Sequence, residues 1–322
     1  MARGKRSKKT QPAVRHLLYQ INTAGSAGTQ KTKFLDLAKG LSFVNRRLYR
    51  QGRNYRVRRI NFTANYFAEP GNADRVANRV NVSVVPPSWV ATNAWRRGFE
   101  TWMNHRKDLL KQTDTGGLEA AYADFKVYLN NQHRTDEGST FDLMPVDQSG
   151  NTVNQTGSNW KYSEVVSEVN AGGSNKTHDL HMLGDHATNN DSVGLIKSYG
   201  ETRATVRSDM PGDQAVENND PLLRVGATNQ NEAATVLGDI RGNNQSPPYA
   251  IDNYPGDDAN MPGSLVVQQG VIDTGDLPLG GFVAMCGLMR IDITTAYETE
   301  NTIRMLVELA PGNYRGVDAE AI

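Results

Sequence analysis

Residues 282–309 read FVAMCGLMRIDITTAYETENTIRMLVEL, and they contain the clearest strand pattern in the chain. Apolar or β-branched residues alternate with polar ones in two runs, which are Ile291, Ile293, Thr295 and Tyr297, and then Ile303, Met305, Val307 and Leu309. A period of two is typical of a strand that buries one face. This stretch therefore predicts a β protein.

The same alternation occurs earlier in the chain. Ile60, Phe62, Ala64 and Tyr66 are separated by polar residues, and Val80, Val82 and Val84 repeat the pattern before Pro86 and Pro87 end it. Further strands are predicted at 125–129, 162–169, 180–183, 193–199 and 265–272. Together these runs predict about eight to ten strands.

One stretch has a strong helical period. Trp95, Phe99 and Trp102 are spaced at i, i+4 and i+7, and Ser88 precedes them as an N-cap. A helix is therefore predicted from Ser88 to about Gln112, within a helical insertion that covers about 88–123. A shorter helix or collapsed turn is predicted after Phe34, ending near Gly52.

Residues 200–263 are rich in Asn, Asp, Gln, Gly and Pro, which predicts long polar loops. Many strands, one helical excursion and long connections indicate an all-β fold, an antiparallel β-sandwich. Within that class a single jelly roll fits best. The predicted division is an N-terminal arm at 1–33, which lacks a sustained apolar period, followed by the jelly-roll domain at 34–322.

Composition excludes several classes of protein. The 322 residues are 38% hydrophobic, enough for a sizeable core, and no apolar run is long enough to span a bilayer. Cys286 is the single cysteine, so no intramolecular disulfide can form, and residues 1–9 contain no apolar stretch typical of a secretion signal. We expect a chain that has no membrane partner and folds in a reducing compartment.

The neutral total charge conceals a strong polarity. Residues 1–59 contain sixteen Lys or Arg and one acid, Asp36, which leaves nineteen basic and thirty-four acidic residues of the 35 and 35 for residues 60–322. The two parts thus carry net charges of +15 and −15. A cationic part beside an anionic part predicts a polyanionic partner.

Basic residues of the N-terminal arm are suited to neutralising phosphates, and also to a nuclear import signal. They are Arg3, Lys5, Arg6, Lys8, Lys9 and Arg15. The simpler alternative is a solvated tail with neither function.

A second basic segment leads into the strand that begins near Ile60 and is interleaved with Tyr49 and Tyr55. Its arginines are Arg46, Arg47, Arg50, Arg53, Arg56, Arg58 and Arg59. Guanidinium groups on a rigid element can bind phosphates bidentately, and tyrosine rings can stack on unpaired bases. The alternative is that some of these arginines pair with acidic loops of neighbouring chains.

Catalytic patterns are scarce. The chain has no glycine-rich dinucleotide fingerprint, phosphate loop, zinc-protease motif or nucleophile elbow. His178, His181 and His186 could by composition hold a metal, but on a strand the first two point to opposite faces. Cys286 lies in an apolar strand pattern and is expected to pack in the core. We therefore expect no enzyme activity, no metal and no cofactor.

Six blocks of the chain resemble a known family. They are LSFVNRRLYRQG at 41–52, PPSWVATNAWRRGFETW at 86–102, DFKVYLNNQHRT at 124–135, HMLGDH at 181–186, SVGLIKSYGETRATV at 192–206 and CGLMRI at 286–291. The sequences of these blocks and their order along the chain resemble those of the capsid proteins of circular Rep-encoding single-stranded DNA viruses, especially the environmental and marine group. The resemblance covers most of the chain after the basic tail.

This resemblance implies a jelly roll that self-assembles into an icosahedral shell, with the basic N-terminus against circular single-stranded DNA. A virion protein made in this way would use the host nuclear import machinery and assemble in the nucleus. Two alternatives stay open, a capsid protein of an RNA virus and a nonviral single-stranded nucleic-acid-binding protein.

Overall fold

The computed structural model describes residues 11–23, 26–64, 78–112, 122–135, 142–153, 160–167, 175–189, 191–203, 265–272, 275–296 and 301–322. Of the described residues, 47% are in strands and 23% are in helices, so the fold is mainly β. It contains several antiparallel sheets, one of them curled into a half barrel. The all-β class predicted from the sequence is therefore right at this level.

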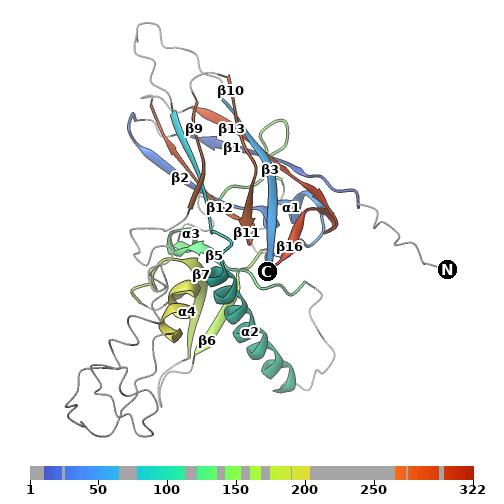
Figure 1. The fold of residues 1–322 in the computed structure, drawn as a ribbon, viewed down its shortest axis with the longest axis vertical. Coiled ribbons are helices and arrows are strands. Elements are labelled where there is room, and N and C mark those ends of the chain that lie inside the picture. The colour runs from blue at the N-terminus through green and yellow to red at the C-terminus, as the bar shows by residue number, and fades with distance from the viewer. Residues whose placement is uncertain are drawn as a thin grey trace, which may run out of the picture.

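One sheet has six strands. The order is β1 (His16–Asn22), β13 (Thr302–Leu309), β3 (Arg53–Ala64) and β10 (Gly275–Leu279), and β11 (Phe282–Met285) and β16 (Ala319–Ala321) also pair with β3. The pairings with β3 and β13 are antiparallel. The long strand β3 thus lies at the centre of this sheet (Figure 1).

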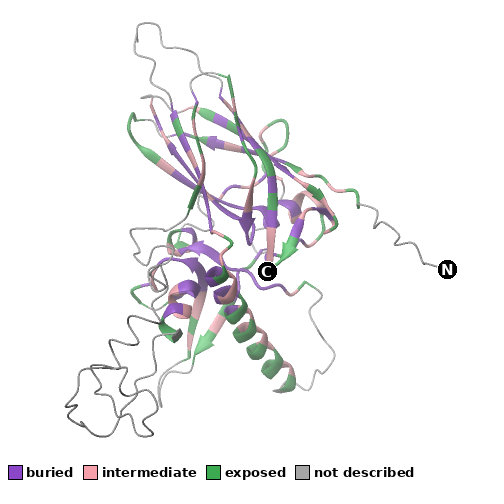
Figure 2. Ribbon diagram, viewed as in Figure 1, coloured by how far each residue is buried: buried purple, intermediate pink, exposed green. Residues whose placement is uncertain are grey.

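A second sheet has four strands in the order β2 (Gln30–Asp36), β12 (Leu288–Thr294), β4 (Asn78–Val84) and β9 (Leu265–Ile272). Alternate residues of both sheets enter one hydrophobic core, among them Tyr19, Phe62, Val82, Ile291 and Met305. Figure 2 shows the buried positions alternating along these strands. The period-two pattern of the sequence is thus the pattern of this shared core.

Helix α1 (Leu37–Asn45) follows β2 directly. The Asp36 carboxylate accepts a hydrogen bond from the Lys39 amide, so Asp36 caps the helix. At the other end Arg46 has a left-handed backbone, with φ of 50°, and its amide donates to the Ser42 carbonyl. These two caps fix where the basic segment begins.

Most of the described residues between β4 and β9 form a separate layer around a second hydrophobic core, which also includes Phe34, Met285, Cys286 and Leu288. The elements of this layer are α2 (Trp89–Gln112), β5 (Tyr128–Asn130), α3 (Asn131–Thr135), β6 (Glu164–Ser167), β7 (Lys176–Leu183), β8 (Ser192–Gly194) and α4 (Leu195–Arg203). The four strands form one sheet against which α2 and α4 pack (Figure 1). Helix α2 lies where a helix was predicted, from Ser88 to about Gln112. The layer, however, extends to α4, well beyond the predicted insertion at 88–123.

The aromatic stripe of α2 belongs to this second core. The Trp95 and Phe99 rings stack with centroids 5.3 Å apart, and the Phe125 ring lies 5.5 Å from Trp95. Trp95 is buried, whereas Trp89 at the start of the helix is 46% exposed. Ser88 accepts from the Ala91 amide, as an N-cap does.

The prediction that residues 1–33 form a flexible arm is wrong for much of that range. Strand β1 and residues 30–33 of β2 lie within it, and Leu17, Tyr19 and Ile21 are fully buried. Their alternation is short and is interrupted by Leu18, while Lys31 and Lys33 break the apolar pattern of β2. Residues 1–10 lie outside the described residues.

Two other predictions need correction. Residues 193–199 were expected to form a strand, but β8 ends at Gly194 and α4 begins at Leu195. Cys286 is buried, but it lies in the turn between β11 and β12, where it and Gly287 both have positive φ. Of the predicted loop region at 200–263, residues 200–203 belong to α4 and the remainder lies outside the described residues.

A two-stranded element closes the C-terminal part. β14 (Pro311–Gly312) pairs with β15 (Gly316–Val317), and Tyr314 and Arg315 lie in the loop between them. Among the helices that the structure describes, none is long and apolar enough to cross a membrane.

Candidate nucleic-acid interface

The basic residues predicted to bind nucleic acid do not form one group in the structure. Arg3, Lys5, Arg6, Lys8 and Lys9 lie outside the described residues. Arg15 directly precedes β1, and its carbonyl accepts a hydrogen bond from the Leu309 amide. Arg15 is thus fixed to the six-stranded sheet and does not belong to a free arm.

Arg46 and Arg47 lie at the exposed end of α1. The backbone of Arg46 caps the helix, and the Arg47 guanidinium donates to the side-chain oxygen of Gln11 at 3.1 Å. Both side chains are exposed. They therefore remain accessible to an anionic partner.

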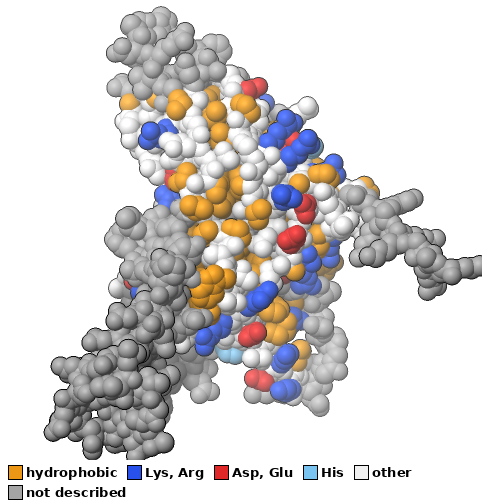
Figure 3. Space-filling view, in the orientation of Figure 1, with side chains coloured by type: hydrophobic (Ala, Val, Ile, Leu, Met, Phe, Trp, Pro, Cys, Tyr) orange, Lys and Arg blue, Asp and Glu red, His pale blue; other side chains and the backbone are white. Residues whose placement is uncertain are grey.

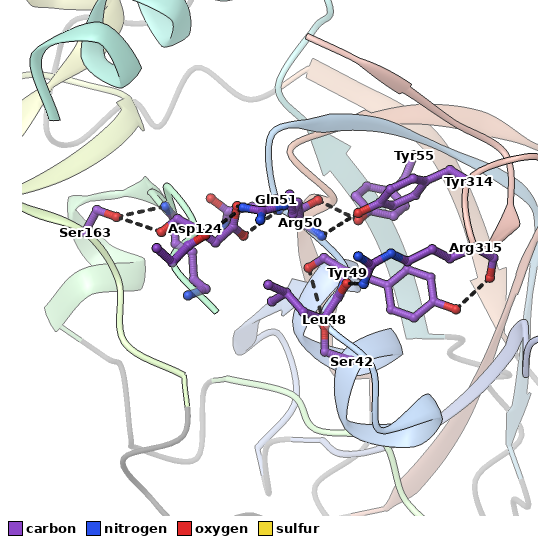
Figure 4. A network of polar contacts seen from close by, with 12 residues as sticks. Ser42, Leu48, Tyr49, Arg50, Gln51, Tyr55, Asp124, Ser163, Tyr314 and Arg315 are labelled. Carbon is purple, nitrogen blue, oxygen red and sulfur yellow. Dashed lines mark hydrogen bonds and ion pairs between the residues drawn. The ribbon is translucent and has the colours of Figure 1, made fainter. Parts of the chain in front are cut away.

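Arg50 and Gln51 connect the sandwich to the inserted layer (Figure 4). Arg50 donates to the Ala123 carbonyl at 2.6 Å and lies 3.4 Å from the Asp124 carboxylate. The Gln51 amide donates to the other oxygen of Asp124 at 3.0 Å. Burial raises the pKa of Asp124, and the bonds from Gln51 and Arg50 oppose that rise.

The Gln51 side chain extends this connection. Its Nε2 donates to Asp36 Oδ2 and to the Val127 carbonyl, each at 3.0 Å, and its Oε1 accepts from the Val127 amide at 2.5 Å. Gln51 is fully buried. It therefore fixes the position of residues 124–127 relative to α1, and we call Arg50, Gln51 and Asp124 the brace.

Both tyrosines predicted to stack on bases are buried. Tyr49 and Tyr55 have no exposed surface, and their hydroxyls donate to the carbonyls of Arg315 and Arg50 at 2.9 and 2.6 Å. The prediction that these two rings bind bases is therefore wrong. Their aromatic character supports the core, where an amphipathic ring with one polar end is favourable.

Arg53 is also held by the fold. Its guanidinium lies over the Tyr314 ring, 3.6 Å from the centroid, and donates to the Ala319 carbonyl at 2.9 Å. The Tyr314 hydroxyl accepts from the Arg50 amide at 2.9 Å (Figure 4). Arg53 is half-buried, and its guanidinium is satisfied by the Tyr314 ring and the Ala319 carbonyl.

A β-bulge turns Arg58 and Arg59 to the outside together. Glu308 on β13 pairs with Arg59 and Leu309 pairs with Val57, so Arg58 has no residue opposite it on β13. Before the bulge the odd residues Tyr55 and Val57 point inward, and after it the even residues from Ile60 onward do. The bulge therefore exposes two adjacent arginines without disturbing the core.

Glu308 is the centre of this basic cluster. Its carboxylate accepts from Arg58 Nη1 at 2.8 Å and from Arg59 Nε at 2.6 Å, and His16 Nε2 lies 3.7 Å away. Desolvation raises the pKa of Glu308, but the hydrogen bond from Arg59 and the charges of Arg58 and Arg59 outweigh it and lower that pKa. Two guanidinium charges share one carboxylate, so the cluster keeps a net positive charge.

Arg56 and Arg58 line a surface hollow of about 770 Å³ together with Phe282, Pro311 and Asp318. The Arg56 and Arg58 side chains are 66% and 65% exposed, and the Asp318 carboxylate lies 3.5 Å from Arg56. Figure 3 shows Lys and Arg side chains interspersed with fewer acidic ones along the flank of the sandwich. We call Arg56, Arg58 and Arg59 the outward arginine surface.

Phe282 lines the same hollow, but its side chain belongs to the core side of the sheet. It lies on β11 directly opposite Val57 of β3, and residues directly opposite on antiparallel strands point to the same face. Val57 is buried in the shared core, and Phe282 is half-buried against that core. Phe282 is therefore not part of the outward arginine surface.

The histidines form separate hydrogen bonds instead of a cluster. His181 is buried with Nδ1 2.6 Å from Ser192 Oγ and Nε2 3.0 Å from the Asp185 carbonyl, and burial lowers its pKa to about 4. His186 Nε2 lies 3.1 Å from Glu201, and His178 Nε2 lies 2.6 Å from Ser167 Oγ. Within the described ranges, no three His, Cys, Asp or Glu side chains are placed to hold a metal.

Cys286 has no exposed surface, and burial raises the pKa of its thiol well above the ordinary range. A buried, protonated thiol is a poor nucleophile.

Comparison with family models, with curated proteins and with solved structures found no match to this chain.

Proposed function

We propose that this chain is a viral capsid protein that self-assembles into an icosahedral shell, with about 60 copies in the smallest closed arrangement. It packages circular single-stranded DNA through a basic N-terminal arm and the outward arginine surface. Its partners are other copies of itself, the genome and the host nuclear import machinery. It acts in the virion, and in the host nucleus during assembly, without enzyme activity or a cofactor.

The order of eight strands in the two large sheets is the observation that carries this proposal; β11 and β16 are two further partners of β3. In chain order the eight strands are β1, β2, β3, β4, β9, β10, β12 and β13, and the first pairs with the last, the second with the seventh, the third with the sixth and the fourth with the fifth. These antiparallel pairs alternate between two sheets. Such nested pairing is expected of a rolled-up hairpin and supports a jelly roll, an architecture common in viral capsids.

Charge supports the nucleic-acid part of the proposal. The +15 of residues 1–59 is concentrated at one end of the chain, and three arginines of β3 project from one exposed surface. Phosphates of a single strand can bind these arginines bidentately.

Electron microscopy of the expressed full chain tests the proposal. We expect closed particles whose contents are protected from nuclease until the particles are opened and are then degraded by DNase and not by RNase. Protected RNA would instead indicate an RNA-virus capsid protein. Small oligomers without shells would indicate a nonviral single-strand-binding protein and would contradict the proposal.

Deleting residues 2–9 tests the role of the arm. Five cations are lost, so the slope of log affinity for single strands against log salt should flatten by about 3.5, at roughly 0.7 per contact. Shells should still form, since the core begins with β1. An unchanged slope would make nuclear import the better explanation of these residues.

A further inference from the structure

The two sides of the sandwich differ in how their sheet edges are covered. At the side of β1 and β2, the Leu143 amide donates to the Phe34 carbonyl at 2.8 Å. The Val146 amide donates to the Leu18 carbonyl at 2.7 Å. At the other side, β9 is the end strand of the four-stranded sheet, and within the described part of the chain only β4 pairs with it. The described residues therefore cover the first side and leave the edge of β9 open.

The sequence of β9 does not protect this edge. Edge strands of soluble proteins usually contain charged side chains or a proline, which prevent pairing with another chain. β9 reads LVVQQGVI and contains neither. In contrast, β10, the end strand of the other sheet and a neighbour of β9, contains Pro278, which has no amide hydrogen to donate. The amides and carbonyls on the outer edge of β9 are thus available to a further strand.

Large apolar side chains on β9 are exposed. Leu265, Val266 and Val271 are 53%, 51% and 56% exposed. Figure 3 shows apolar side chains over this part of the sandwich. Exposed apolar side chains that gather on one element are typical of a surface that contacts another protein.

A β-bulge places two of these side chains on one face. The bulge gives β9 one extra residue, so Val266 lies opposite Ser83 and Val271 lies opposite Arg79. Ser83 and Arg79 alternate with the core valines of β4 and point away from the shared core. Val266 and Val271 therefore lie on the outer face of the sheet, near the two ends of the strand.

We propose that β9 pairs with β9 of a second copy of this chain, antiparallel and about a two-fold axis near Gln269. The two four-stranded sheets would then form one continuous sheet. The two-fold axis brings Val266 of each copy beside Val271 of the other, so that apolar side chains meet apolar ones. Since β9 has no charged residue, the two strands meet without repulsion. The choice of a second copy as partner rests on the proposed function.

A single contact of this kind should be weak. A strand of 8 residues is about 27 Å long, and one added strand buries less than the roughly 1,200 Å² of a stable interface. The contact should therefore be strongest where other contacts hold the two copies together.

Oxidative cross-linking of Gln269→Cys at high protein concentration tests the pairing. Gln269 is exposed and the natural Cys286 is buried, so only the introduced thiol is accessible. Across the axis the two Cα atoms should lie about 5 Å apart, which a disulfide can span. A covalent dimer is expected on a non-reducing gel, whereas Gln132→Cys, exposed on α3, should stay monomeric. Monomer alone for Gln269→Cys would overturn the proposal.

Charge variants in the Gln269→Cys chain test the orientation. Val266→Lys with Val271→Lys places like charges opposite each other and should reduce the yield of dimer about tenfold. Val266→Glu with Val271→Lys changes the same positions but places opposite charges together, so the yield should be kept. Equal yields from the two variants would contradict the antiparallel pairing. A cross-linked dimer in a chain that forms no shells would support the pairing and contradict only the proposed function.

Discussion

Residues 50–53 and 56–59 are both rich in arginine, yet the structure uses them differently. Arg50 and Arg53 bind carbonyls at Ala123 and Ala319, far away in the chain. Arg56 and Arg58 line an open hollow, and their carboxylate partners are at the surface or shared. Local composition therefore does not tell an arginine that is held by the fold from one that is left exposed. The difference lies in the partners that residues far away in the chain supply to each arginine.

The energetic consequences differ as well. The brace lies among buried groups, where an unsatisfied polar atom costs more than an exposed ion pair contributes. Changes in the brace should therefore reduce stability, and changes in the outward arginine surface should reduce binding.

Gln51→Ala should have the largest effect. It leaves the Val127 amide and carbonyl and one Asp36 oxygen without the Gln51 side chain, and the free energy of unfolding should fall by about 4 kcal/mol. Denaturant unfolding measures this. Gln269→Ala, at an exposed position of β9, should change stability by less than about 0.5 kcal/mol. If Gln51→Ala lost as little stability as is expected for Gln269→Ala, the brace would not be needed for stability.

Acid should affect the region of the brace through two buried groups with opposite signs. Burial raises the pKa of Asp36 to about 6, against the bonds from Lys39 and Gln51, so its contribution to stability grows as pH falls from about 6 toward 4. Burial lowers the pKa of His133 to about 4, so its contribution is lost as pH falls from 6.5 toward 4. The two largely offset each other in the natural chain.

Asp36→Asn removes only the first contribution. The variant should therefore lose about 2 kcal/mol more than the natural chain between pH 6.5 and 4, as measured by unfolding at several pH values. Asp108→Asn, an exposed carboxylate of α2, is the control. Parallel pH profiles for Asp36→Asn and the natural chain would contradict the assignment.

Arg50→Gln should have a smaller effect. The side chain is 46% exposed, and its loss removes the bonds to Ala123 and Asp124, so about 1 kcal/mol of stability should be lost. Arg46→Gln is the matched control, since only the backbone of Arg46 caps α1. If both variants unfold at the same denaturant concentration, Arg50 is not part of the brace.

The sequence predicted several elements close to their observed positions. β4, β9 and β13 lie close to their predicted positions, and α2 follows from its aromatic stripe. β1 was missed because Leu18 interrupts a short pattern. β3 begins at Arg53, earlier than predicted, because arginines on the outward face concealed the alternation of Tyr55 and Val57.

The candidate site was less predictable. Arginine density drew attention to β3, but the bulge at Arg58 depends on its pairing with β13. The burial of Tyr49 depends on the loop at Arg315. Each of these contacts joins residues from opposite ends of the chain, so no local pattern contains them.

A paired salt titration tests the division between the brace and the outward arginine surface most directly. Arg56→Gln with Arg58→Gln removes the same charge as Arg50→Gln with Arg53→Gln, and binding of a short oligothymidylate is measured for both. The outward pair should flatten the slope of log affinity against log salt by about 1.4, while the free energy of unfolding changes by less than about 1 kcal/mol. The inner pair should keep the slope and lose about 2 kcal/mol of stability. If the inner pair flattens the slope as much as the outward pair does, the two halves of the segment are not divided as described.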